Sequence, residues 1–389
     1  MSWPLQNIGE VIAFKGGGTP RKDVDEYWSD DIPWASVKDF KSLEISATKD
    51  HISQKGLESS AANLIPKGNV IIPTRMALGK AAINSIDVAI NQDLRALIPK
   101  IPFDSRFLLH AMISLAPQIE RQGSGATVKG ITQARLAAIK IPTPPIEEQK
   151  RIAGILDAAD ELRTKRRESL AQLDALLQST FLDMFGDPVT NPKGWDVVTL
   201  GNIATRITKG QSPKWQGFTY QDEGLLFVTS ENVRDGFLDI AKPKFVELEF
   251  NEKLKGSTLR SGDLLINLVG ASIGRSCIFN GYQGLANVNQ AVGVVSLGDP
   301  VFATFVIQML QTQQGRALLT GRIVEAARAN ISLKNLRELV VPAPPLELQS
   351  EFSNRVLEIQ KQRDRNNAQL TELDTLFASL QSRAFRGEL

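Results

Sequence analysis

Apolar and polar positions along the chain follow two patterns, one typical of strands and one typical of long helices. Short β-branched runs separated by Gly, Pro, Asn and Asp predict strands and turns in residues 1–145 and again in 189–345. Apolar stretches at 107–116 and 301–310 predict one helix in each block. The strand candidates are VIAF (11–14), NVIIP (69–73), LRALIPK (94–100), LLFVTS (225–230), DLLINLVG (263–270) and AVGVVSL (291–297).

Each block is followed by a segment whose apolar positions step by three and four residues. These segments, 146–188 and 346–389, begin directly after the proline-rich stops PTPP and PAPP. Proline suits the entry to a helix and prevents its extension backwards. The stepping predicts a coiled-coil seam of about five heptads in each segment, and a helical rod of about 54 Å.

Both predicted seams become polar at the same place. Arg163 and Arg166 interrupt the first seam, and Arg363 and Asn366 interrupt the second. Polar seam residues lower stability but can fix the register and the partner of a helix. The alternative is that the rod is thin there and these side chains extend into water.

The chain contains an internal repeat whose offset grows from 192 to 200 residues. IPWASVKDF (32–40) matches LLFVTSENV (225–233), and IKIPTPPIEEQ (139–149) matches LVVPAPPLELQ (339–349). The repeat predicts an α+β protein with pseudo-two-fold symmetry. Two similar mixed α/β domains, 1–145 and 189–345, are separated by two long antiparallel coiled-coil helices, 146–188 and 346–389.

Composition narrows the class of protein without identifying it. The 389 residues are 42% hydrophobic and 23% charged, typical of a globular protein, and contain no apolar run of about 18 residues that would predict a membrane span. The net charge is +2. Both domain blocks are mildly basic, with 17 basic against 14 acidic residues in the first and 16 against 13 in the second. The N-terminus lacks the pattern of a secretory signal, and the single Cys277 fits a reducing cytoplasm, so we expect a cytoplasmic protein.

Catalytic and cofactor motifs are missing from the sequence. Two histidines and one cysteine leave little material for a zinc site. TPPI (143–146) and APPL (343–346) lack the Asn and the aromatic residue of an adenine methyltransferase motif. GASIGRS (270–276) is one residue short of a phosphate-binding loop and has Arg in place of Lys. We therefore expect no catalytic residue, no metal and no cofactor in this chain.

Several motifs together resemble those of the specificity subunits of type I restriction–modification enzymes. The strongest is IPTPPIEEQKRIAGILD (141–157), at the entry to the first long helix. The second copy departs from the first, with KGQSP (209–213) in place of the glycine loop. The other carriers are WPLxxIGEV (3–11), GGGTP (16–20), YW (27–28), IPWxS (32–36), KGNVII (67–72) and INQ (90–92).

This resemblance implies a non-catalytic subunit that reads a bipartite site on double-stranded DNA. It implies two modification subunits, which use S-adenosylmethionine to methylate adenine, and restriction subunits, which require ATP and Mg. Two other functions stay open from the residues themselves. One is a coiled-coil scaffold that does not read DNA, and the other is a solitary methyltransferase, which the missing motifs oppose.

Candidate DNA contacts are polar side chains in the predicted loops. The glycine loop and its counterpart offer side chains for phosphates, although an ordinary turn with solvated lysines explains them equally well. The glutamines can bond adenine in the major groove or tie down a turn. Trp3, Trp34 and Trp195 are expected in the core, and Trp215 is expected to be exposed. The candidates are Lys15, Thr19, Arg21, Lys22, Arg75, Lys80, Gln92, Lys209, Ser212, Lys214, Arg275 and Gln290.

Overall fold

The protein is described from a computed structural model, which covers residues 3–125, 128–321 and 330–389. The chain divides into two compact units. The first comprises Met1–Arg167 and Ala368–Leu389, and the second comprises Glu168–Asn367. Both units contain strands and helices, so the predicted mixed α/β character is confirmed.

Two sheets and a short strand pair form the first unit. The short pair consists of β1 (Leu5–Asn7) and β11 (Lys140–Pro142). The five-stranded sheet has the order β2 (Ile12–Gly16), β10 (Leu94–Pro99), β7 (Val70–Pro73), β8 (Ala82–Asn84) and β4 (Glu44–Ile45). The four-stranded sheet has the order β5 (Asp50–Ile52), β3 (Ile32–Ala35), β9 (Val88–Ile90) and β6 (Asn63–Ile65).

The second unit repeats this arrangement. Its short pair is β12 (Val197–Thr199) with β21 (Val340–Pro342). One sheet has the order β13 (Ala204–Lys209), β20 (Val292–Leu297), β17 (Leu264–Asn267) and β18 (Ser276–Ile278). The other has the order β14 (Tyr220–Gln221), β16 (Phe245–Val246), β15 (Leu225–Val228) and β19 (Ala286–Val288).

The repeat extends to strand direction. The pair β3–β9 is parallel, and so is its counterpart β15–β19. The order β2-β10-β7-β8 in the first unit corresponds to β13-β20-β17-β18 in the second. The similarity first found in the sequence is therefore a similarity of topology. All six predicted strands are present in it.

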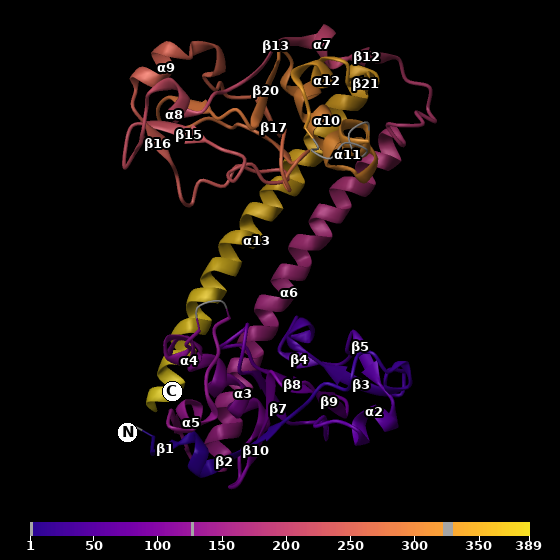
Figure 1. The fold of residues 1–389 in the computed structure, drawn as a ribbon. Coiled ribbons are helices and arrows are strands. Elements are labelled where there is room, and N and C mark those ends of the chain that lie inside the picture. Colours follow the sequence, from indigo (N-terminus) through magenta and orange to yellow (C-terminus); the bar gives the residue numbers. More distant parts are fainter. Residues whose placement is uncertain (1–2, 126–127, 322–329) are drawn as a thin grey trace. The chain divides into compact units, whose positions relative to one another are not determined.

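Short helices cover the sheets, and two long helices, α6 and α13, connect and follow the blocks (Figure 1). In the first unit they are α1 (Ile8–Val11), α2 (Gln54–Glu58), α3 (Ser105–Ser114), α4 (Ala116–Gln122) and α5 (Gln133–Ala137), with 3-10 turns η1 (Asp25–Tyr27) and η2 (Val37–Asp39). In the second they are α7 (Leu200–Ile203), α8 (Pro213–Gln216), α9 (Glu249–Lys253), α10 (Pro300–Gln311), α11 (Gln313–Thr320) and α12 (Leu333–Arg337), with η3 (Lys255–Ser257).

The central strand β7 is buried on both faces, which explains its continuous apolar run. Val70 and Ile72 pack with Phe107 of α3, whereas Ile71 between them packs with Ile90 of the second sheet. This alternation follows from the two-residue period of a strand. Strand β7 thus packs against the second sheet on one face and against α3 on the other.

The predicted long helices are confirmed as α6 (Ile146–Phe185) and α13 (Leu346–Arg386). The first half of α6 and the second half of α13 belong to the first unit. There Arg163 pairs with Asp374, and Arg151 donates a hydrogen bond to the main-chain oxygen of Leu389, so the two segments run in opposite directions. Seam positions such as Ile152 are buried, as the stepping predicted.

The seam arginines Arg163 and Arg363 meet carboxylates on the other helix rather than water. Arg163 is 19% exposed in its side chain, lies 2.7 Å from Asp374 and stacks over the ring of Phe377 at 4.3 Å. In the second unit Arg363 is 16% exposed and lies 3.2 Å from Asp174. The interpretation that these arginines extend into water is therefore wrong, because a carboxylate from the opposite helix reaches each of them.

The same region of the second unit contains a fully buried amide. The Asn366 side chain donates a hydrogen bond to the Ser169 hydroxyl at 3.1 Å. A polar pair of this kind favours one helix alignment, because a shifted partner would leave the amide buried without its acceptor.

A buried histidine fastens the first block, residues 1–145, to α6. Nε2 of His110 in α3 lies 2.7 Å from Asp157, which also accepts two hydrogen bonds from Arg106. Burial lowers the pKa of His110 below its ordinary value of 6.5, although Asp157 acts in the opposite direction. The imidazole is therefore neutral in the folded protein at neutral pH.

We expect this histidine to make the fold sensitive to mild acid. Because the pKa of His110 is lower in the folded state, the unfolded chain binds more protons below pH 6.5, and the free energy of unfolding falls there. Urea midpoints measured at pH 7.5 and 5.5 should show this loss, and His110→Gln should reduce it. An equal loss in the variant would contradict the assignment.

Candidate nucleic-acid interface

The glycine loop after β2 is packed tightly against the end of β9. The Gly18 amide donates a hydrogen bond to the carbonyl of Ile90 at 3.0 Å. A Cβ on Gly17 would lie 1.9 Å from that same oxygen, so only glycine fits. The Gly18 amide is already bonded within the protein, so this loop presents side chains rather than that amide to a ligand.

A cavity of about 1030 Å³ opens beside this loop, and we call it the loop cavity. It brings together Thr19, Lys22 and Gln92, three of the predicted contacts. The Thr19 hydroxyl donates a hydrogen bond to the Gln92 carboxamide. The whole lining consists of Thr19, Lys22, Asp25, Trp28, Trp34, Ser36, Val37, Lys38, Asp50, Met76, Asn91, Gln92 and Asp93.

Aromatic rings form one wall of the loop cavity. Trp28 and Trp34 meet edge to face, with ring centroids 5.3 Å apart. The Trp34 indole donates to the carbonyl of Gly18 at 3.0 Å, which fixes the wall to the glycine loop. Trp34 is buried as predicted, whereas Trp3 and Trp195 are half-buried.

The turn between β9 and β10 lines the cavity with Asn91, Gln92 and Asp93. Asp93 is only 7% exposed, and its Oδ1 lies 3.6 Å from the guanidinium of Arg75. The Asp93 amide donates to the Asn91 side chain, and the Asp93 carbonyl accepts from the Thr74 amide. Sequence reasoning missed Asp93. The signal that could have found Asp93 is its position directly after Gln92, a predicted base contact.

Four other predicted contacts of the first unit do not line the loop cavity, although one of them, Arg75, lies beside Asp93. Lys15 is exposed on β2 and donates to the carbonyl of Leu64. Arg21 is paired with Asp23, which raises the pKa of the guanidinium further. Lys80 lines a different cavity and donates to the carbonyl of Phe40 at 3.1 Å.

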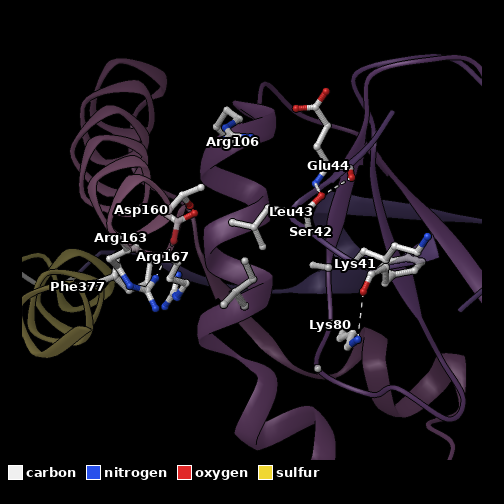
Figure 2. Close-up of a pocket in the computed structure, with 15 residues that line it drawn as sticks. Lys41, Ser42, Leu43, Glu44, Lys80, Arg106, Asp160, Arg163, Arg167 and Phe377 are labelled. Atoms are coloured by element: carbon white, nitrogen blue, oxygen red, sulfur yellow. Dashed lines mark hydrogen bonds and ion pairs between the residues drawn. The ribbon is translucent and has the colours of Figure 1, made fainter. Parts of the chain in front are cut away.

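This different cavity, of about 750 Å³, lies within the first unit between the 40–44 loop and the long helices (Figure 2). Its arginines are held by carboxylates. Arg163 binds Asp160 as well as Asp374, and Arg167 also binds Asp374. Because carboxylates of the protein neutralise the charges of these arginines, the arginines join the first block to the helices and are not free for a ligand.

The second unit repeats the packing of the glycine loop. A Cβ on Gly210 would lie 1.6 Å from the carbonyl of Val288, as Gly17 does with Ile90. Lys209, Lys214 and Gln290 are exposed, and Ser212 is half-buried directly before α8. Arg275 is half-buried in the turn before β18. Trp215 is 77% exposed, which confirms its predicted position at the surface.

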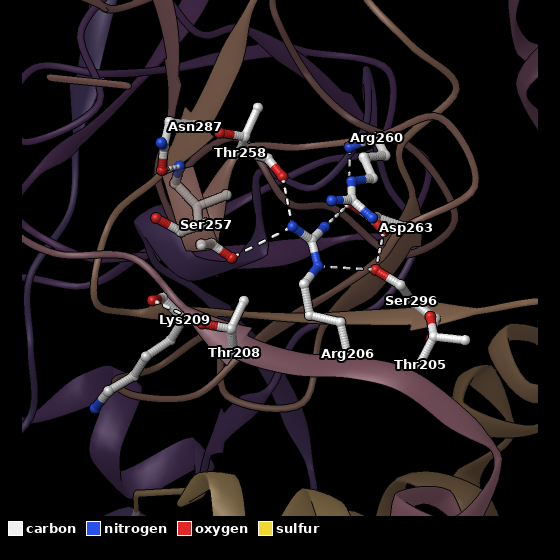
Figure 3. A network of polar contacts seen from close by, with 12 residues as sticks. Thr205, Arg206, Thr208, Lys209, Ser257, Thr258, Arg260, Asp263, Asn287 and Ser296 are labelled. Carbon is white, nitrogen blue, oxygen red and sulfur yellow. Dashed lines mark hydrogen bonds and ion pairs between the residues drawn. The ribbon is translucent and has the colours of Figure 1, made fainter. Parts of the chain in front are cut away.

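One further arginine in the second unit, Arg206, is fully engaged by the protein (Figure 3). Its Nη2 donates to Asp263 at 2.6 Å, Nε donates to the Ser296 hydroxyl, and Nη1 donates to the Thr258 carbonyl. These bonds tie β13 to the neighbouring strands. Arg206 therefore has a structural role and is not available to a ligand.

Groups suited to other chemistry are scarce in the described ranges. No cluster of three or more His, Cys, Asp or Glu residues there could hold a metal ion. Burial raises the pKa of the Cys277 thiol to about 12, so it stays protonated. The helices within residues 3–125, 128–321 and 330–389 all lack the length or the apolar character needed to cross a bilayer.

Comparison with known proteins shows which proteins this chain resembles. Residues 2–173 match the family described as the type I restriction modification DNA specificity domain. The relatives are named specificity subunits of type I restriction enzymes, and this chain is similar to them. Specificity subunits are the non-catalytic chains of these enzymes.

Each of the following matches covers only part of the relative's length. The chain is 27% identical to the MjaIX specificity subunit of Methanocaldococcus jannaschii over 60% of its own length and 59% of that protein. It is 32% identical to the EcoR124I/EcoR124II specificity subunit of Escherichia coli over 45% of both. The matched part thus spans 59% and 45% of these relatives.

A solved structure shares the fold. The type I restriction–modification S subunit from M. genitalium superposes with a TM-score of 0.57 at 16% identity, over 98% of this chain and 96% of that one. The mixed α/β fold of this chain is therefore one that a specificity subunit adopts.

Proposed function

We propose that this chain is the DNA-reading subunit of a type I restriction–modification complex. Each recognition block reads one half of a bipartite site, and α6 with α13 forms an antiparallel spacer between the two blocks. The observation that carries the proposal is the repeat of topology: both units share the order of four strands in one sheet, a parallel strand pair in the other and the same glycine-loop packing, but have different exposed side chains. Two similar scaffolds with different surfaces suit the reading of two different half-sites.

The proposal assigns each predicted DNA contact to one of the two blocks. In the first block, Thr19, Lys22 and Gln92 surround the loop cavity, with Arg75 beside Asp93. Lys15, Arg21 and Lys80 lie outside that group and would contact phosphates. In the second block the candidates are Lys209, Ser212, Lys214, Arg275 and Gln290.

The proposed partners carry the chemistry. Two modification subunits would bind S-adenosylmethionine and methylate adenine, and restriction subunits would use ATP and Mg, so this chain itself holds no cofactor. The complex would act in the cytoplasm, where the DNA is. The long helices support a docking role, because Leu162 and Leu376 are about half exposed on them.

We expect the purified chain to transfer no methyl group to DNA and to cut no DNA. Tritiated S-adenosylmethionine with duplex DNA should give counts equal to a mock preparation, whereas adding the modification subunit should give methylated adenine. Turnover by the chain alone would favour the solitary methyltransferase.

The scaffold alternative is tested by binding. Filter binding at low salt should retain random duplex, because phosphate contacts act without sequence. Failure to bind any duplex, even together with the modification subunits, would favour a scaffold that does not read DNA.

A further inference from the structure

The two units have the same backbone turn at residues 91–93 and 289–291, but the side chains on the turn differ. Asn91, Gln92 and Asp93 correspond to Asn289, Gln290 and Ala291 in the repeat. In both turns the asparagine side chain accepts a hydrogen bond from the amide two residues on, at 3.0 and 3.1 Å. Both glutamines are exposed. The backbone is therefore shared, and the third residue differs: a carboxylate in one unit and a methyl group in the other.

The neighbouring strand end shows the same contrast. Arg75 forms an isolated bridge with Gly130, and its counterpart Val269 forms one with Asn330. The next residue has a positive φ in both units, 66° for Met76 and 79° for Gly270. Methionine is costly in that conformation, yet the Met76 side chain stands 59% exposed at the rim of the loop cavity. The first unit thus has an Arg–Asp pair with an exposed methionine beside it. At the corresponding positions the second unit has the small apolar residues Val269, Gly270 and Ala291.

One oxygen of the Asp93 carboxylate, Oδ1, is a buried acceptor. Among the residues that the structure describes, no group donates to its Oδ1, although that atom is buried and the side chain lines the loop cavity. Arg75 lies at 3.6 Å, within ion-pair range but without a hydrogen bond, and is itself largely exposed. A buried acceptor left unbonded costs free energy, which a ligand donor would recover.

We propose that Asp93 reads a base of the first half-site by accepting a hydrogen bond from its exocyclic amino group. Carboxylates accept from cytosine N4 in the major groove, and adenine N6 offers the same donor. Gln92 and Met76 border the cavity that the base edge would enter, and the Asn91 side chain holds the Asp93 amide in place. This inference rests on the proposed DNA-reading function. The preference for a base with an exocyclic amino group is expected only in the first unit, because the side chain of Ala291 has no hydrogen-bond acceptor.

The test uses the chain assembled with its modification subunits and duplexes carrying the methylated motif. Each position of the first half-site is changed to the other three bases, and competition binding is measured at one salt concentration. The wild type should prefer one amino-bearing base at one position by about tenfold, which is about 1.4 kcal/mol. A 2-pyrimidinone in place of cytosine, or purine in place of adenine, removes only the amino group and distinguishes the two sources.

Asp93→Ala should abolish that preference and leave the other positions unchanged. Alanine already occupies this turn at Ala291, so the backbone accepts it. Discrimination in the second half-site serves as an internal control for folding, and Glu58→Ala is a control for the same change of charge. Asp93→Asn, which keeps the size of the side chain, should shift the preference toward adenine, because a carboxamide can bond both N6 and N7.

Two results would overturn the inference. One is an unchanged preference in both Asp93 variants. The other is a uniform change across all sequences, which would indicate an electrostatic effect on phosphates. Either would leave the proposed function standing, since the bipartite preference would persist. A wild-type complex without preference in either half-site would instead refute the proposed function.

Discussion

Exchanging residues 195–345 for the matching block of a related specificity subunit should change one half of the methylated DNA motif and leave the other half intact. Among the described residues, the block carries most of its own core, and each core cluster lies within one of the two units. Sites without shared partners contribute almost additively. Each mismatched base pair typically costs ~1–3 kcal/mol, so a new half-site should replace the old one completely.

The structure sets a condition on the design of this chimera. The block rests on the long helices through Phe305, whose ring lies 4.8 Å from that of Phe185 and 5.3 Å from that of Phe181. Phe352 of α13 closes the same cluster. The donor block must therefore supply a large apolar side chain at the position of Phe305, since a small one would leave a cavity costing about 3–5 kcal/mol.

Methylome sequencing of cells carrying the chimera gives the outcome. The reciprocal exchange of residues 1–145 is the matched control and should change the other half. A chimera that assembles with its modification subunits yet keeps the old motif, or alters both halves, would refute two independent readers.

Lengthening both long helices by four residues should widen the gap between the half-sites by one or two base pairs. Four residues add ~6 Å of helix, against ~3.4 Å for one base pair along a strand. The insertions belong after Arg167 and after Asn367, where the two compact units divide. There they leave the Arg163–Asp374 pair and the Asn366–Ser169 pair intact within their own units.

The half-sites themselves should stay unchanged in the double insertion. A variant lengthened only in α6 is the control, because its two helices no longer match in length and it should assemble poorly. An unchanged gap in the double insertion would show that the helices do not measure the spacer.

Much of the fold could be predicted because its signals are local or repeated. The three-and-four stepping through Ile152 and Leu156 is visible in the sequence alone, and the helices follow it. Strand β7 was predicted from its β-branched run. The repeat then linked the two halves, since one sequence pattern written twice indicates one topology built twice.

The partners of polar residues could not be predicted, because they come from distant segments. Nothing near Arg163 in the sequence indicates Asp374, since their contact depends on the register of two helices. The loop cavity likewise joins the glycine loop to the turn at Asp93, about 75 residues later. Sequence reasoning selected residues that usually contact DNA and so overlooked an acidic one.

Binding of the assembled complex to four duplexes tests the central claim most directly. One duplex carries the full motif, two carry a change in one half-site each, and the fourth carries both changes, all at one salt concentration. Independent readers predict a loss in each singly changed duplex, and a loss in the doubly changed one equal to their sum within ~0.3–0.5 kcal/mol. A half-site whose change costs nothing, or a coupling well beyond that range, would contradict the account.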